Sequence, residues 1–297
     1  MFDKILHASD GSKHAFHALT LALAIAKQNK SELHLVCVEE VPYLPEVVEE
    51  DRGAKETAAR RIRGVLQRAC TMAEECQVEL HTHVIAGHPV RDIVRLAADL
   101  KADLLVIGAT GHSALYERMI GSQADRMVQL APCPVLVVKL PVTTAAGPIF
   151  NKILHANDGS KHAVQALRLA LAIAKQNKSE LHMACVEEVP YLPEVVEEDR
   201  EEPGPVARRI RGVLQRARAM GDECQVEVHT HVIKGNPVRD IVKLAADLDV
   251  DLLAIGARGH TALYERMIGS QADRIMQLAQ CPVLVAKLPA AEVAGTT

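Results

Sequence analysis

The 297-residue chain contains the same sequence twice. A shift of 148 residues aligns 2–141 with 150–289 without a gap, and 30 of the 140 aligned pairs differ. A repeat of this length is a whole domain, because solenoid proteins repeat much shorter units of about 20 to 50 residues. We therefore expect two copies of one fold: a first domain at 1–141, a linker at 142–149, a second domain at 150–289 and a tail at 290–297.

Apolar runs and helical patterns alternate along each copy. The apolar run KILHAS at 4–9 is followed by the turn signal DGS at 10–12. The apolar residues after this turn recur at helical spacing. This pattern predicts a strand followed by a helix. Further strands are predicted at 32–38, 78–85, 103–108 and 133–139. Such alternation favours a parallel sheet with helices on both faces.

Composition disfavours nucleic acid and membranes as partners. The chain has 34 Lys and Arg against 38 Asp and Glu, with four Tyr, three Phe and no Trp, so it lacks a basic surface and stacking platforms. No apolar run approaches the roughly 20 residues of a membrane span, and the first residues do not resemble a signal peptide. The seven cysteines include no Cys-x-x-Cys pair. We expect a cytoplasmic protein with free thiols.

A glycine-spaced phrase follows the predicted fourth strand in each copy. It reads GATGHSALYERMIGS at 108–122 and GARGHTALYERMIGS at 256–270. Glycines can take positive φ and leave backbone N–H groups exposed in one concavity, and the final Gly-Ser opens a helix whose N-terminus attracts anions. The phrase therefore predicts a phosphate cradle. Two alternatives remain: a capping box formed by Ser122 and Asp125, and ordinary glycine turns.

An acidic residue follows the first predicted strand. In an open parallel sheet, ligands bind beyond the carboxyl ends of the strands, where the strand order reverses. Asp10 stands at such an end, and its carboxylate suits a ribose or an adenine amine. The alternative is that Asp10 caps the first helix.

Each copy as a whole resembles the universal stress protein domain. Nucleotide-binding members of that family carry Gly-x2-Gly-x9-Gly-Ser/Thr after the fourth strand, and both copies keep this motif. The resemblance implies an α/β fold of two tandem doubly wound five-stranded parallel sheets, adenine nucleotide alpha hydrolase-like, with strand order 3-2-1-4-5. The residues expected to bind ATP, with or without magnesium, are Asp10, Val38, Gly108, Gly111, His112, Gly121 and Ser122, and in the second copy Asp158, Val186, Gly256, Gly259, His260, Gly269 and Ser270.

The last predicted strand of each copy is apolar, and this affects how the two copies are expected to pack. An apolar strand at a sheet edge promotes aggregation unless it is covered. We therefore expect the two copies to pack as an intramolecular pseudo-two-fold pair through these segments. A homodimer of whole chains is compatible with the sequence but is not demanded by it.

The predicted function is that of an ATP-binding regulatory protein of the stress response, which changes conformation or binds an unidentified protein partner. The alternative is a slow ATPase or another nucleotide-handling enzyme. Neither a P-loop nor a Gly-x-Ser-x-Gly elbow is present, and no residue is an evident general base, so we expect no catalytic residue and at most weak hydrolysis. His112 and His260 are the nearest candidates for that chemistry.

Histidines in the strands suggest a minor alternative, a metal-binding stress protein. His81 and His83 share one side of a predicted strand, as do His229 and His231, and His34 on the neighbouring strand could add a ligand. Half-exposed strand histidines without metal are the simpler interpretation. His7 and His155 replace an aliphatic residue of the family, and we expect them to be buried and hydrogen-bonded. Arg258 replaces Thr110 inside the second glycine phrase.

Overall fold

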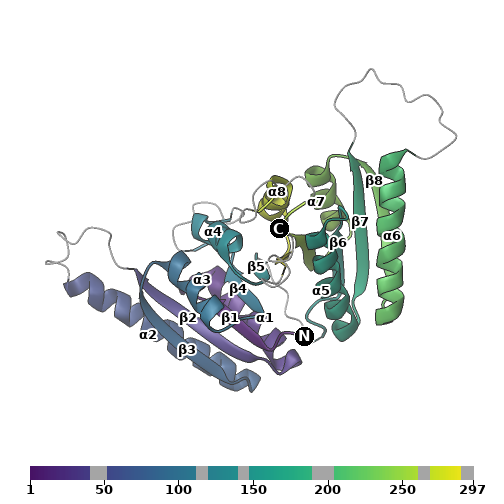
Figure 1. The fold of residues 1–297 in the computed structure, drawn as a ribbon. Coiled ribbons are helices and arrows are strands. Elements are labelled where there is room, and N and C mark those ends of the chain that lie inside the picture. Colours follow the sequence, from purple (N-terminus) through teal and green to yellow (C-terminus); the bar gives the residue numbers. More distant parts are fainter. Residues whose placement is uncertain (41–51, 112–119, 140–146, 189–203, 260–267, 289–297) are drawn as a thin grey trace. The chain divides into compact units, whose positions relative to one another are not determined.

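The computed structural model describes residues 1–40, 52–111, 120–139, 147–188, 204–259 and 268–288, with side chains of α2 described from residue 56 onward (Figure 1). The chain divides into two compact units, Met1–Ala145 and Ala146–Thr297. Most of the predicted linker at 142–149 lies outside the described residues. The pseudo-two-fold relation between the repeats stays a prediction.

Strands and helices alternate in the first unit, as the sequence predicts. The elements are β1 (Lys4–Ala8), α1 (Lys13–Asn29), β2 (Glu32–Glu40), α2 (Arg52–Cys76), β3 (Leu80–Gly87), α3 (Pro89–Asp99), β4 (Leu104–Gly108), α4 (Ser122–Leu130) and β5 (Val135–Val138). Ser12 caps α1 by accepting a hydrogen bond from the Ala15 amide. Pro89 occupies the first turn of α3, where its missing N–H costs nothing.

The second unit repeats this order. Its elements are β6 (Lys152–Ala156), α5 (Lys161–Asn177), β7 (Glu180–Glu188), α6 (Pro205–Cys224), β8 (Val228–Gly235), α7 (Pro237–Asp247), β9 (Leu252–Gly256), α8 (Ser270–Leu278) and β10 (Val283–Ala286). Ser160 caps α5 as Ser12 caps α1. The local sequence therefore produces the same elements in both units.

Each unit is built on a parallel sheet. The strand order is β3-β2-β1-β4-β5 in the first unit and β8-β7-β6-β9-β10 in the second. In the first unit, α1 packs against β1, β4 and α2, while α3 packs against β2 and α4 (Figure 1). The predicted doubly wound five-stranded sheet is confirmed, and the strand order reverses between β1 and β4, which pair directly.

Strands in the middle of the sheet are buried on both faces. Ile5, Leu6 and Leu105 have no exposed surface, and Leu104 is also fully buried. Continuous apolar runs such as LLVI suit this position, because helices cover both faces of a parallel sheet. The rigid core therefore ends at the carboxyl edge of the strands, where the polar and glycine residues of the candidate site begin.

Candidate nucleotide site

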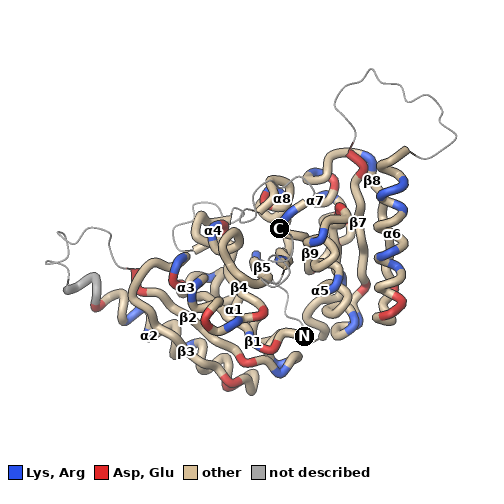
Figure 2. Tube along the Cα trace, viewed as in Figure 1, with Lys and Arg blue, Asp and Glu red and all other residues tan. Residues whose placement is uncertain are grey.

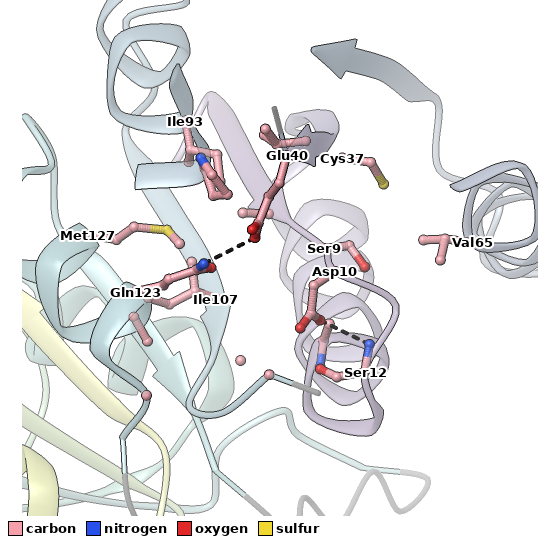
Figure 3. Close-up of a pocket in the computed structure, with 18 of the residues that line it drawn as sticks. Ser9, Asp10, Ser12, Cys37, Glu40, Val65, Ile93, Ile107, Gln123 and Met127 are labelled. Atoms are coloured by element: carbon pink, nitrogen blue, oxygen red, sulfur yellow. Dashed lines mark hydrogen bonds between the residues drawn. The ribbon is translucent and has the colours of Figure 1, made fainter. Parts of the chain in front are cut away.

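A cavity of about 420 Å³ opens at the carboxyl ends of β1, β2 and β4. Its walls come from these strand ends and from α2, α3 and α4 (Figure 3). It lies where the strand order reverses, the expected location for a ligand in this fold. The described residues predicted from the first repeat all line this one cavity: Asp10, Val38, Gly108, Gly111, Gly121 and Ser122. His112 and His260 lie outside the described residues.

Close approach of other atoms requires glycine at position 108 and favours it at position 111. A Cβ atom at position 108 would lie 2.9 Å from the backbone of His14 and Ala15, at the start of α1. A Cβ at position 111 would lie 2.6 Å from Asp10 Oδ2. The second unit repeats this packing, since a Cβ at position 259 would lie 2.7 Å from Asp158 Oδ2. Glycine thus lets the β4 turn lie directly against the β1 turn.

Positive φ, which the sequence allowed for the glycines of the phrase, does not occur at Gly108, Gly111 or Gly121. Gly121 has φ of −69° and Gly269 has φ of −68°, both in the extended region. Positive φ occurs instead at Gly11 (81°) and Gly159 (85°), in the turns that follow β1 and β6. The described glycines of the phrase take ordinary backbone conformations, and it is the DGS turn that needs the left-handed region.

The start of α4 has no side-chain cap. Gly121 is the N-cap residue and makes no side-chain cap bond, whereas Ser122 is the first helical residue. The capping box suggested by Ser122 and Asp125 is therefore wrong. The Gly121 amide donates to the Ala109 carbonyl at 2.8 Å, which ties the helix start to the β4 turn. The first amides of α4, at the positive end of the helix dipole, line the cavity beside this turn.

Asp10 does not cap α1, because Ser12 does so. Its Oδ1 accepts a hydrogen bond from the Ser12 amide at 2.9 Å, which orients the carboxylate over the turn. The Asp10 side chain is exposed and lines the cavity (Figure 3). Asp158 accepts from the Ser160 amide at 3.0 Å in the same way. The carboxylate is thus held at the cavity wall, between the ends of β2 and β4.

The apolar part of the cavity was only partly predicted. Val38 was expected from the family resemblance, and Ile93, Ile107 and Met127 join it from α3, β4 and α4. A further wall comes from the first half of α2, where Ile62 and Val65 pack against Cys37 of β2. Their helical spacing signalled a buried face, but not which strand end it would cover.

Cys37 and Cys185 are structural thiols. Burial raises the pKa of each thiol to about 11, and the nearby Asp10 or Asp158 carboxylate adds to this rise. Both thiols therefore stay protonated at neutral pH, which makes them poor nucleophiles. The described cysteines form no disulfide, in line with the expectation of free thiols.

The strand histidines cluster at the amino-terminal half of β2, away from the cavity. His34 stacks on His81 and His83, and it shares a hydrogen bond of 3.0 Å with His83 between Nδ1 and Nε2. Burial lowers the pKa of both His34 and His83. Within the described ranges, no three His, Cys, Asp or Glu side chains are arranged to hold a metal ion.

The model of the universal stress protein family matches residues 1–139 and again residues 150–287. The chain belongs to the universal stress protein family. Its tandem arrangement of two such domains is confirmed by the two matches. No helix in the described parts of this universal stress protein is long and apolar enough to cross a membrane.

Relatives match either one repeat or both. A universal stress protein of Methanocaldococcus jannaschii is 36% identical over 146 residues, which cover 48% of this chain and 84% of the relative. One of Mycobacterium tuberculosis is 26% identical over 237 residues, or 76% of each chain. The crystal structure of a universal stress protein from Archaeoglobus fulgidus covers 96% of this chain and 98% of its own, with a TM-score of 0.73 and 21% identity. That likeness shows the shared fold.

Proposed function

We propose that each repeat binds one adenine nucleotide at the carboxyl edge of its sheet, and that nucleotide binding controls conformation or partner binding in a stress response. The observation that carries the proposal is the convergence of Asp10, Val38 and the glycine phrase around one cavity at the reversal of strand order. The cavity volume of about 420 Å³ falls in the range of about 300 to 1,000 Å³ that small-molecule pockets occupy.

The cavity walls offer suitable contacts for each part of a nucleotide: the base, the ribose and the phosphates. Val38, Ile93 and Met127 form an apolar slot for a base. Asp10 stands beside the β1 turn, where a carboxylate can accept hydrogen bonds from ribose hydroxyls. The described lining residues include one basic side chain, Arg61, and no lysine, so the amides of the β4 turn and of α4, together with the Ser122 hydroxyl, are the main donors to the phosphates.

Titration calorimetry with ATP tests the proposal. The expected stoichiometry is close to two per chain, with affinity in the micromolar range, which corresponds to about 8 kcal/mol. Gly121→Val should remove one site, and Gly121→Val with Gly269→Val should remove both. A Cβ at position 121 would lie 3.7 Å from its nearest neighbour, which is an ordinary van der Waals contact. Circular dichroism should therefore report a folded chain. Unchanged ATP affinity in the folded double variant would overturn the assignment.

Turnover measured beside binding separates regulation from slow ATP hydrolysis. We expect rates far below the roughly 1 to 1,000 per second of ordinary enzymes. Substitution of His112 and His260 by Ala is the informative control for any residual hydrolysis. Native mass spectrometry of the purified protein reports bound nucleotide and oligomeric state in one measurement, including any homodimer.

A further inference from the structure

A hydrogen bond joins two residues that line the cavity of the first unit, and its counterpart occurs in the second unit. Gln123 Nε2 donates to Glu40 Oε1 at 3.2 Å (Figure 3). Gln271 Nε2 donates to Glu188 Oε1 at 2.7 Å. Gln123 directly follows Ser122, so the bond joins the end of β2 to the first turn of α4. A carboxylate is therefore held beside the proposed phosphate cradle in both units.

Strand alternation decides which of two neighbouring acids reaches this position. Cys37 faces α2, where it packs against Ile62 and Val65. Because successive side chains of a strand point to opposite faces, Glu39 shares that face, whereas Glu40 shares the other face with Val38. Glu40 therefore meets α4, and Glu39 provides a matched comparison one residue away on the same strand.

The charges around the cavity are unfavourable for a bare polyphosphate. Among the described lining residues, Asp10, Glu39 and Glu40 are acidic and Arg61 alone is basic. The corresponding acidic residues of the second unit are Asp158, Glu187 and Glu188, and Figure 2 shows acidic residues in red at the end of β7. Three carboxylates against one guanidinium repel a ligand that carries several negative charges.

Glu40 also competes with a phosphate group for the positive end of the α4 dipole. The amino-terminal end of α4 attracts anions, and the Glu40 carboxylate already accepts a hydrogen bond from a side chain of its first turn. A phosphate entering the cradle meets this negative charge at close range. A divalent cation bound to the phosphates offsets the repulsion, because it reduces the charge that the ligand brings.

We propose that Glu40 and Glu188 determine the charge that each site accepts, so that a nucleotide whose phosphates carry a divalent cation binds better than the bare polyphosphate. This inference rests on the proposed nucleotide site. It concerns specificity: the two carboxylates need not touch the base or the ribose. Gln123 and Gln271 act as positioning residues that hold the carboxylates beside the helix start.

The test is calorimetry of Glu40→Gln with Glu188→Gln, which changes both sites together. With ATP in EDTA, we expect this double variant to bind about three to ten times more tightly than wild type, and the gain in affinity from magnesium to shrink by a similar factor. Adenosine, which has no phosphate, should bind both proteins equally. The difference between the two proteins should fade at high ionic strength, where charges are screened within about 3 Å.

Two further variants serve as controls. Glu39→Gln with Glu187→Gln removes the same number of charges from the opposite face of the strands. Because Glu39 also lines the cavity, this variant should bind bare ATP more tightly than wild type, but by a smaller factor than the Glu40 and Glu188 variant; an equal factor would show that the position of the charge beside α4 does not matter. Gln123→Glu with Gln271→Glu adds a carboxylate at the helix start, and should weaken the binding of bare ATP while leaving adenosine binding unchanged.

The outcomes distinguish this inference from the proposed function. If wild type binds ATP neither in EDTA nor with magnesium, the nucleotide site itself is wrong and the inference falls with it. If wild type binds ATP, but the Glu40 and Glu188 variant matches it within twofold in EDTA, the nucleotide site stands and the charge selection is overturned. If the variant binds ATP more tightly and its affinity for adenosine rises by the same factor, the charge selection is also overturned, because the effect does not depend on phosphate.

Discussion

His7 donates a hydrogen bond from Nδ1 to the Val106 carbonyl oxygen, 3.0 Å away on the neighbouring strand β4. His155 donates to Ala254 at 3.1 Å in the second unit. Both histidines have no exposed surface, which confirms the expectation that they are buried and hydrogen-bonded. A polar side chain thus occupies an apolar strand, where it links β1 to β4 directly beneath the candidate site.

The first prediction concerns pH. Burial lowers the pKa of His7 and of His155 to about 4, below the value of about 6.5 in the unfolded chain. The unfolded chain therefore binds protons first as the pH falls. We expect the free energy of unfolding to be steady above about pH 7, and to fall between about pH 6.5 and 4 by about 3 kcal/mol for each histidine. Urea denaturation across this range measures the change.

The control for this prediction is His7→Asn with His155→Asn. Asparagine keeps an N–H donor for the strand carbonyl but does not titrate. The double variant should lose less stability than wild type over the same pH range. An equally steep loss in the variant would assign the acid sensitivity to other groups.

The second prediction compares two glycines of the same phrase. Gly108→Ala places a Cβ 2.9 Å from the backbone of α1, so the strand and helix must move apart. We expect a loss of about 1 to 3 kcal/mol in the free energy of unfolding. Gly121→Ala meets nothing closer than 3.7 Å and should stay within about 0.5 kcal/mol of wild type. Equal losses in the two variants by urea denaturation would contradict the packing argument.

The third prediction concerns Gly111, whose added Cβ would lie 2.6 Å from Asp10 Oδ2. A side-chain carboxylate can rotate away at small cost, so Gly111→Ala should fold with little loss of stability. The displaced carboxylate should then weaken adenosine and ATP binding at the first site by similar factors. Calorimetry with both ligands, in a Gly269→Val background that leaves one site, checks this. A loss confined to ATP would place the effect at the phosphates instead.

The fourth prediction concerns a buried contact next to the cradle. Thr110 Oγ1 and His14 Nδ1 lie 2.8 Å apart, and both side chains are buried. Thr110→Val keeps the shape but removes the hydroxyl, so we expect a loss of about 1 to 3 kcal/mol in the free energy of unfolding. Thr71→Val, at an exposed site on α2, should change stability by less than about 0.5 kcal/mol. If both variants match wild type, the hydroxyl contributes nothing to stability.

Much of the fold could be predicted because its signals are local. Apolar periodicity predicted each strand and helix, and the repeat predicted that the order would occur twice. The site was predicted in outline for a similar reason. Asp10 and Gly108 both stand at the carboxyl ends of strands, and parallel strands bring those ends to one edge of the sheet.

The sequence by itself determined the element types, the duplication and the polar residues at the strand ends, because hydrophobic period and turn chemistry act over a few residues. Only the tertiary structure decided that Gly111 makes room for Asp10 and that Glu40 meets Gln123. The last contact joins residues 83 positions apart. It depends on how α4 packs over the end of β2, and no local pattern carries that information.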